Sequence, residues 1–287
     1  MTRRIDHLVV AVQDLDGAAA FYEKLGFQVG ARNRHPWGTE NRLVQLRTSF
    51  IELITLGADG AIAPHGEKFF SFGAFVRDYL KRREGLAMLV LDSAHAKDDA
   101  ALFAREGIGT FEPFFFERAG KRPDGSEIQL AFTLAFARRP HAPLAGFFVC
   151  QHHFPENFWN AAFQVHTNEA QDIAVVALSA PDPEAEAEFL TRFTGVEPTS
   201  PAEHDLAFAL AGSHLDVMTP DDAGEQYGSV EIEMDQPCFV GFAVLIADLN
   251  EQASRLDRAR IPYARIGSRL VVPASAAFGV AIAFEAT

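Results

Sequence analysis

The first fifty residues begin and end with short apolar runs that are interrupted by polar side chains. The opening run, residues 5–12, reads IDHLVVAV, and the closing run, residues 50–54, reads FIELI. Runs of this kind predict strands, whose side chains alternate between two faces. His7 and Glu52 then each lie on an otherwise apolar face, where an ionisable group is costly without a partner. The pattern therefore predicts a partner shared by His7 and Glu52, and a divalent metal is one such partner.

Residues 14–26, between these two strands, have the pattern of a helix. Asp14 can cap the start of this helix, and Gly26 can end it. Its buried face is predicted from apolar residues at helical spacing, which are Leu15, Ala18, Ala19, Tyr22 and Leu25. Residues 28–31 and 42–47 predict two further strands, with the loop 35–42 between them. The unit therefore has the order strand, helix and three strands.

The same order recurs imperfectly three more times along the chain. The second unit starts with the strand 85–91 and the helix 96–106, and continues with the strands 109–117, 128–138 and 146–153. The third runs from the strand 173–178 through the helix 183–193 to the strand 213–218, and the fourth from 238–244 through 249–260 to 280–285. A loop-like stretch, 155–171, divides the four units into two pairs. We therefore expect an α+β protein of two domains, residues 1–160 and 170–287.

Composition limits the class of protein. The 287 residues exceed the usual size of one domain, and 48% apolar with 22% charged residues is ordinary for a globular protein. The formal net charge of −14 argues against a nucleic-acid partner. The sequence has neither a signal-peptide pattern nor a membrane-spanning apolar run, so we expect a cytoplasmic protein with no membrane partner. Cys150 and Cys238 stand in apolar surroundings and are expected to be buried thiols.

Four βαβββ units, with a His on the first strand and a Glu on the last strand of the leading unit, resemble the vicinal-oxygen-chelate (VOC) superfamily. That superfamily includes glyoxalase I, extradiol dioxygenases and bleomycin-resistance proteins. More narrowly, residues 5–10 (IDHLVV) and residues 35–44 (HPWGTENRLV) look like its glyoxalase-like subgroup. This narrower resemblance covers about the first 160 residues. The second half of the chain matches only by pattern.

The resemblance implies that each pair of units forms a curved mixed sheet enclosing a cavity, in which strand residues hold one divalent metal. Carried over to this chain, it makes His7 and Glu52 metal ligands. A nitrogen and a carboxylate donor suit Fe, Mn, Zn, Ni or Co without choosing among them. The other units offer no nitrogen ligand at or near the place of His7, where the chain has Met88, Ala174 and Gly241.

A further ligand is expected from the end of the second unit, residues 150–153. Gln151 and His153 share one face of this predicted strand, and we favour them as ligands. His152 is the next candidate ligand, because a register slip of one residue exchanges the two faces of the strand.

The leading hypothesis is a metal-dependent enzyme of the glyoxalase or dioxygenase type, acting as a lyase, isomerase or oxidoreductase on a small oxygenated molecule. Glu52 is the expected catalytic base. The loop residues His35, Thr39, Asn41 and Arg42 are the expected substrate contacts. The alternative is a metal-free protein that sequesters a small molecule, as bleomycin-resistance proteins do. The expected partner is a small-molecule substrate, and a homodimer is left open.

Simpler structural roles compete with several of these interpretations. His7 could be a hydrogen-bonded core residue, the loop 35–42 a hairpin connection, and His152 and His153 the end of a strand. The phenylalanine-rich run 111–116 is expected in the core rather than in a substrate pocket. Because only the first unit has both the His and the Glu, we expect function in the first pair, with the second pair as scaffold, lid or partner surface.

Overall fold

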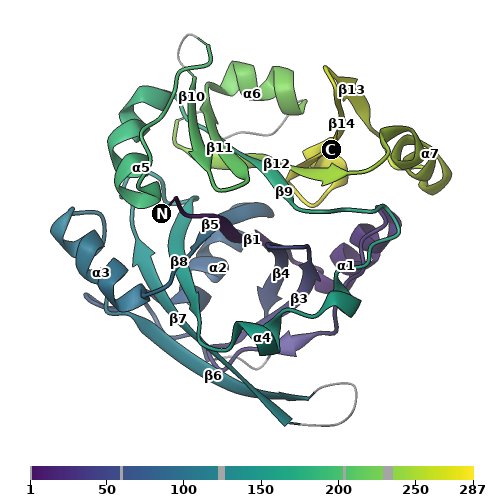
Figure 1. The fold of residues 1–287 in the computed structure, drawn as a ribbon. Helices are drawn as coiled ribbons and strands as arrows, with labels where there is room; N and C mark the ends of the chain where they lie inside the picture. Colours follow the sequence, from purple (N-terminus) through teal and green to yellow (C-terminus); the bar gives the residue numbers. More distant parts are fainter. Residues whose placement is uncertain (1, 59–60, 122–126, 203–204, 229–234) are drawn as a thin grey trace.

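The computed structural model describes residues 2–287 apart from residues 59–60, 122–126, 203–204 and 229–234. Its strands form two mixed sheets, one for each predicted pair of units (Figure 1). The first sheet has the strand order β2-β3-β4-β1-β5-β8-β7-β6, and the second has the order β10-β11-β9-β12-β15-β14-β13. This arrangement confirms the predicted α+β fold of paired units.

The first sheet contains the first two units. Unit one consists of β1 (Ile5–Ala11), α1 (Leu15–Lys24), β2 (Asn33–Arg34), β3 (Thr39–Gln45) and β4 (Phe50–Leu56). Unit two consists of β5 (Gly85–Asp92), α3 (Ala96–Arg105), β6 (Phe114–Lys121), β7 (Glu127–Ala137) and β8 (Gly146–His152). The helix α2 (Phe72–Leu80) joins the two units, and Figure 1 shows the sheet curved around it.

The second sheet contains the last two units, and short helices α4 (Pro155–Phe158) and η1 (Ala161–Phe163) precede it. Unit three consists of β9 (Ile173–Ser179), η2 (Pro183–Glu186), α5 (Ala187–Thr194), β10 (Leu206–Leu210) and β11 (Ser213–Met218). Unit four consists of β12 (Cys238–Ile246), α7 (Leu249–Ala259), β13 (Ala264–Ile266), β14 (Arg269–Val272), η3 (Ala274–Ala276) and β15 (Ala281–Ala286). The helix α6 (Pro220–Tyr227) follows unit three as α2 follows unit one. Among the described residues, unit three has two strands after its helix, and an isolated bridge joins Thr199 to Ala207.

Strand pairing follows one rule in both sheets. The first strand of each unit lies parallel to the last strand of the same unit, as β1 does to β4 and β9 does to β11. The first strands of neighbouring units are antiparallel, as β1 is to β5 and β9 is to β12. The first and last strands of each unit therefore bring their side chains together at the middle of the sheet.

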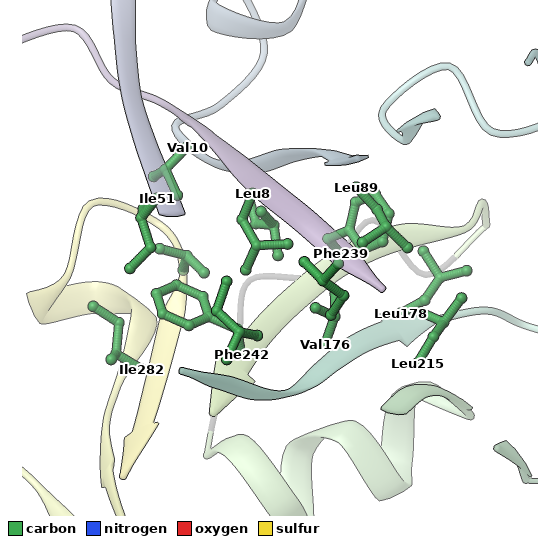
Figure 2. Close-up of a cluster of buried hydrophobic side chains, with 14 of the residues drawn as sticks. Leu8, Val10, Ile51, Leu89, Val176, Leu178, Leu215, Phe239, Phe242 and Ile282 are labelled. Atoms are coloured by element: carbon green, nitrogen blue, oxygen red, sulfur yellow. The ribbon is translucent and has the colours of Figure 1, made fainter. Parts of the chain in front are cut away.

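The two sheets pack against each other through one continuous apolar core. Leu8 and Val10 of β1 face Phe239 and Phe242 of β12 in this core, and all four are fully buried (Figure 2). Because strand side chains alternate between faces, the neighbouring His7 points to the opposite side, into the curve of the first sheet. Packing of the two sheets thus fixes which face of β1 lines the cavity.

Irregular strand pairing fixes which residues are equivalent in the four units. Between β1 and β5, Ile5 pairs with Leu91 and His7 pairs with Val90, so Asp6 is an extra residue in a β-bulge. The same shift of register recurs on the other three first strands. It makes Met88, Val175 and Gly241 the equivalents of His7. In the third unit, the equivalent of His7 is therefore Val175 and not the neighbouring Ala174. Neither side chain can bind a metal.

Three other expectations concern the chain as a whole. Cys150 and Cys238 are both buried thiols, as predicted. Within the described ranges, no helix has the length and apolar character that crossing a bilayer requires. The division into domains 1–160 and 170–287 stays a prediction: each sheet lies within one of these ranges, while the core is shared between them.

The shared core predicts that the two sheets unfold together. Replacing Phe242, which is 0% exposed, by Ala should lower the free energy of unfolding by about 3–5 kcal/mol, because the cavity left behind cannot collapse fully. Phe115→Ala, at a side chain that is 53% exposed, is the control and should change stability by about 0.5 kcal/mol or less. Urea denaturation followed by circular dichroism measures both. An early separate transition in Phe242→Ala, in place of a shifted single transition, would contradict a shared core.

Candidate functional site

A cavity of about 60 Å³ lies inside the curve of the first sheet. That volume holds a few water molecules or a group of a few heavy atoms, which is less than a drug-sized ligand needs. Its polar lining comes from His7, His35, Asn41, Glu52 and Arg118. Its apolar lining comes from both units and is mostly aromatic, with Trp37, Leu43, Phe50, Phe72, Phe116, Phe132, Leu134, Phe148, Cys150 and Phe158.

His7 and Glu52 meet on the floor of this cavity. Glu52 lies two residues along β4 from Phe50, which pairs with His7 on β1. The Nε2 atom of His7 lies 3.8 Å from Oε2 of Glu52. The two residues are only 5% and 6% exposed, and the His7 ring stacks on Phe50 at 4.2 Å between ring centroids. The structure thus brings together the two residues for which the sequence predicted a shared partner.

Asn41 and His35 complete the surroundings of the Glu52 carboxylate. Asn41 Nδ2 donates a hydrogen bond of 2.5 Å to Oε1 of Glu52, and His35 Nε2 lies 3.9 Å from the same oxygen. His35 Nδ1 lies 2.8 Å from Thr39 Oγ1, which fixes the ring orientation. Burial lowers the pKa of His35 and outweighs the opposite effect of Glu52, so its imidazole is neutral near pH 7. The buried Oδ1 atom of Asn41 has no hydrogen-bond partner among the described residues.

Asp6 links His7 to the second unit. Its position in the bulge lets its carboxylate reach His7 Nδ1 at 3.3 Å, although the two residues are neighbours in the chain. The same carboxylate lies 2.9 Å from Nε2 of His152 through both of its oxygens. Burial alone would raise the pKa of Asp6, but His152 and His7 together hold it well below its usual range. Asp6 is therefore an ionised group that orients His7 with Nε2 facing Glu52.

Asp6, Cys150 and His152 form a second group of side chains that could hold a metal. Their candidate ligand atoms all lie within 4.8 Å of one another. Burial, reinforced by the charges of Asp6 and Glu52, raises the pKa of the Cys150 thiol well above its usual value. The thiol is therefore protonated without a metal, and it would release its proton on binding one. Because Asp6 bonds both His7 and His152, we interpret this cluster as the group that holds His7 in place.

Alternation along β3 decides which of the expected substrate contacts reach the cavity. Asn41 lines it, whereas the next residue, Arg42, points to the other face and bonds Asp16 Oδ1 at 2.8 Å. Thr39 holds His35 in place and does not itself line the cavity. The structure therefore brings His35 and Asn41 to the site, and it does not bring Arg42.

Alternation along β8 likewise separates the expected third ligands from Glu52. Gln151 Oε1 accepts a hydrogen bond from the backbone N–H of Ala96 at the start of α3. His153 Nε2 lies 2.7 Å from Thr133 Oγ1. His152, on the opposite face, turns toward the first unit and bonds Asp6. The structure thus does not place Gln151 or His153 beside His7 and Glu52.

Several residues that line the cavity were not predicted from the sequence as site residues. Trp37 stacks on His35 at 4.4 Å between ring centroids, and Phe116 meets the edge of Trp37 at 4.8 Å. Arg118 follows Phe116 by two residues, on the same face of β6. The run 111–116 is therefore not simply core: Phe116 is a wall of the cavity, and Phe115 is largely exposed.

The second sheet lacks the corresponding arrangement. Asp216 pairs with Ala177 just as Glu52 pairs with Val9, and burial raises the pKa of Asp216. The place equivalent to His7 is covered, because a Cβ atom added at Gly241 would lie 2.5 Å from Cδ1 of Tyr227 in α6. The ring of Tyr227 thus packs directly against β12 at this position.

A larger cavity, of about 620 Å³, lies between α2 and residues 137–146. The ring of Phe136 lies against Phe70, which lines this larger cavity, and against Phe148, which lines the smaller one. Among the described residues, its lining contains no group of side chains with metal-ligand geometry. We place the candidate chemistry in the smaller cavity, because His7 and Glu52 meet there.

The buried Asp6–His152 pair predicts a large cost when one partner is removed. Asp6→Ala should lower the free energy of unfolding by about 3–5 kcal/mol, because His152 loses the carboxylate that offsets its burial. Asp16→Ala is the control: this carboxylate is 63% exposed in its ion pair with Arg42, so its loss should change stability far less. Denaturant titrations give both values.

A second variant separates the pair from simple packing. The double variant Asp6→Ala/His152→Phe should be more stable than Asp6→Ala alone, since it removes the buried imidazole of His152 that Asp6→Ala leaves unpaired, while His7 Nδ1 loses Asp6 in both variants. A double variant no more stable than the single one would argue against this ion pair as the cause.

The chain was compared with known proteins by sequence and by structure. Residues 5–194 match the family model described as a glyoxalase-like domain. The match includes the whole first sheet and continues through β9 and α5 of the second. Among curated protein sequences, none matches the chain.

Several solved structures share the fold along nearly the full length. A hypothetical protein from Staphylococcus aureus has a TM-score of 0.73 at 12% identity, covering 99% of this chain and 100% of its own. A mutant 4-hydroxymandelate synthase from Streptomyces coelicolor has a TM-score of 0.58 at 12% identity, covering 99% and 92%. The Mn(II)-bound glyoxalase from Novosphingobium aromaticivorans has a TM-score of 0.57 at 13% identity, covering 100% and 83%. Identities this low show the fold alone. With paired βαβββ units and a family match over most of its length, the chain belongs to the glyoxalase-like domain family of the VOC superfamily.

Proposed function

We propose that the chain is a metal-dependent enzyme that acts on a small oxygenated organic molecule in the cavity of the first sheet. The observation that supports this most is the position of the Glu52 carboxylate. Its two oxygens face Nε2 of His7 at 3.8 Å and Nε2 of His35 at 3.9 Å on the cavity floor. Two imidazoles and one carboxylate form a donor set that binds divalent transition metals.

Each imidazole lies within metal-bridging distance of one Glu52 oxygen. Ligand atoms bound at about 2.0–2.2 Å can lie up to about 4.3 Å apart across the metal, and His7 Nε2 and His35 Nε2 are each closer than that to a different oxygen of Glu52. The three residues do not offer one atom each within 4.8 Å of one another, so binding a metal would draw the two imidazoles together. The neutral imidazole of His35 can donate the lone pair of Nε2 to a metal once the contact between Nε2 and Asn41 Nδ2 is broken. The unpartnered Oδ1 atom of Asn41 is a further sign that a polar partner belongs at this place. Fe, Mn, Zn, Ni and Co all suit this donor set.

The second unit contributes walls to the site in place of ligands. Met88 stands at the place of His7, and Phe148 stands at the place of Glu52. The sequence predicted a metal site with ligands from both units. The proposed site instead has three donors, all from the first unit. Three protein ligands leave positions open for two oxygens of a substrate. The Mn(II)-bound glyoxalase shares this fold, which supports a metal in the cavity by analogy only.

The chain's own residues favour proton transfer at a carbon next to a carbonyl, as in a lyase or isomerase. A bound metal would supply Lewis-acid polarisation of that carbonyl. Asn41 holds one oxygen of Glu52, and the other oxygen is the atom placed to accept a proton. Asp6 orients His7, and the aromatic walls exclude water from the reacting atoms. A dioxygenase would use the same donors with Fe(II), without need of Glu52 as a base.

Metal analysis of variants tests this proposal. Protein purified without chelator or affinity tag should contain about one equivalent of metal, and His7→Ala or Glu52→Gln should lose it, because a metal site needs several donors at once. Asp216→Ala, at the position equivalent to Glu52 in the third unit, is the matched control and should keep the metal. Cys150→Ala should also keep it.

Two results would contradict the proposal. Loss of the metal in Cys150→Ala, with Glu52→Gln unaffected, would move the site to the Asp6–Cys150–His152 cluster. Failure of the wild-type protein to take up any of the five metals on reconstitution would favour the metal-free binding protein.

A further inference from the structure

Arg118 is the one Lys or Arg among the described residues that line the cavity over Glu52. It comes from β6, which belongs to the second unit, and it faces the cavity on the same side of the strand as Phe116. Burial lowers the pKa of this guanidinium, which nevertheless stays charged, and Glu52 acts on it in the opposite direction. A positive charge thus stands in an otherwise aromatic wall.

Among the described residues, the hydrogen bonding of Arg118 leaves most of its donors without a protein partner. Nη1 donates a hydrogen bond of 2.8 Å to Oδ1 of Asn33 on β2, which belongs to the first unit. A guanidinium has five N–H donors, so one neutral partner leaves several unsatisfied. Within the described part of the chain, no carboxylate forms an ion pair with Arg118, in contrast to Arg32 and Arg42, which bond Asp16. Asn33 therefore positions the guanidinium without neutralising it.

We propose that Arg118 binds the carboxylate of the substrate, so that the substrates are small carboxylates with a short apolar body. This inference rests on the proposed function, because it places the reacting end of the substrate at Glu52. The planar fork of Arg118 matches the two oxygens of a carboxylate. Phe116, Phe132 and Phe158 would contact the apolar body. The volume of about 60 Å³ limits that body to a few heavy atoms.

A simpler role for Arg118 is to offset the buried charge of Glu52. That role predicts a loss of stability, with no preference between charged and neutral ligands, when Arg118 is replaced. Carboxylate binding predicts a loss that depends on the charge of the ligand. Propionate and propionamide distinguish the two roles, because they have nearly the same shape and differ in charge.

Titrations of the purified full-length protein, followed by two-dimensional NMR, test the assignment. Arg118→Gln should bind propionate about tenfold or more weakly than wild type, because hydrogen bonds to a charged group are lost. Its affinity for propionamide should not change. Arg118→Lys should fall between Arg118→Gln and wild type for propionate, since it keeps the charge and loses the fork. Arg42→Gln is the matched control, because Arg42 points away from the cavity, and it should bind propionate like wild type.

Three results would overturn the assignment: equal weakening of both ligands in Arg118→Gln, no weakening of either, or no binding of propionate by the wild-type protein. Metal content separates this inference from the proposed function. Arg118→Gln should keep the wild-type metal content. If the wild type proves metal-free while propionate binding still depends on Arg118, the proposed function fails and the carboxylate site stands.

Discussion

Burial of the Glu52 carboxylate is the constraint on which the site depends. A carboxylate that is 6% exposed among aromatic rings is unfavourable unless other groups offset its charge. Asn41 donates a hydrogen bond to it, His7 and His35 face its two oxygens, and Arg118 adds a positive charge nearby. Each of these groups comes from a different strand or loop of the first sheet. The requirement to offset one charge therefore explains why the polar residues of the cavity converge.

The fold meets this requirement in only one of its two sheets. Both sheets place the first and last strands of each unit side by side, so both could build a site at the same positions. In the second sheet, Tyr227 covers Gly241, and Asp216 has no histidine on the neighbouring strand, where Val175 stands. The outer faces of the two sheets share one core, which fixes the direction of His7 on β1. The second pair thus contributes to the core that orients β1 of the first.

The sequence predicted those features that depend on local periodicity. The four units, the helix stop at Gly26 and the shared cavity face of His7 and Glu52 all follow from spacing along the chain. The same alternation could also have shown that Asn41 and Arg42 cannot both face the cavity. The bulge at Asp6 could not be predicted, because it depends on pairing with β5. The sequence also could not show which of residues 151–153 faces the first unit, because a register shift of one residue exchanges the two faces of the strand.

X-ray absorption of the zinc-loaded protein tests the central claim most directly, because it reports the metal ligands without a substrate. The account predicts a first shell of nitrogen and oxygen at about 2.0–2.2 Å, with the scattering pattern of two imidazoles. A sulfur ligand at about 2.3 Å would contradict it, because it would place the metal on Cys150 beside Asp6 and His152.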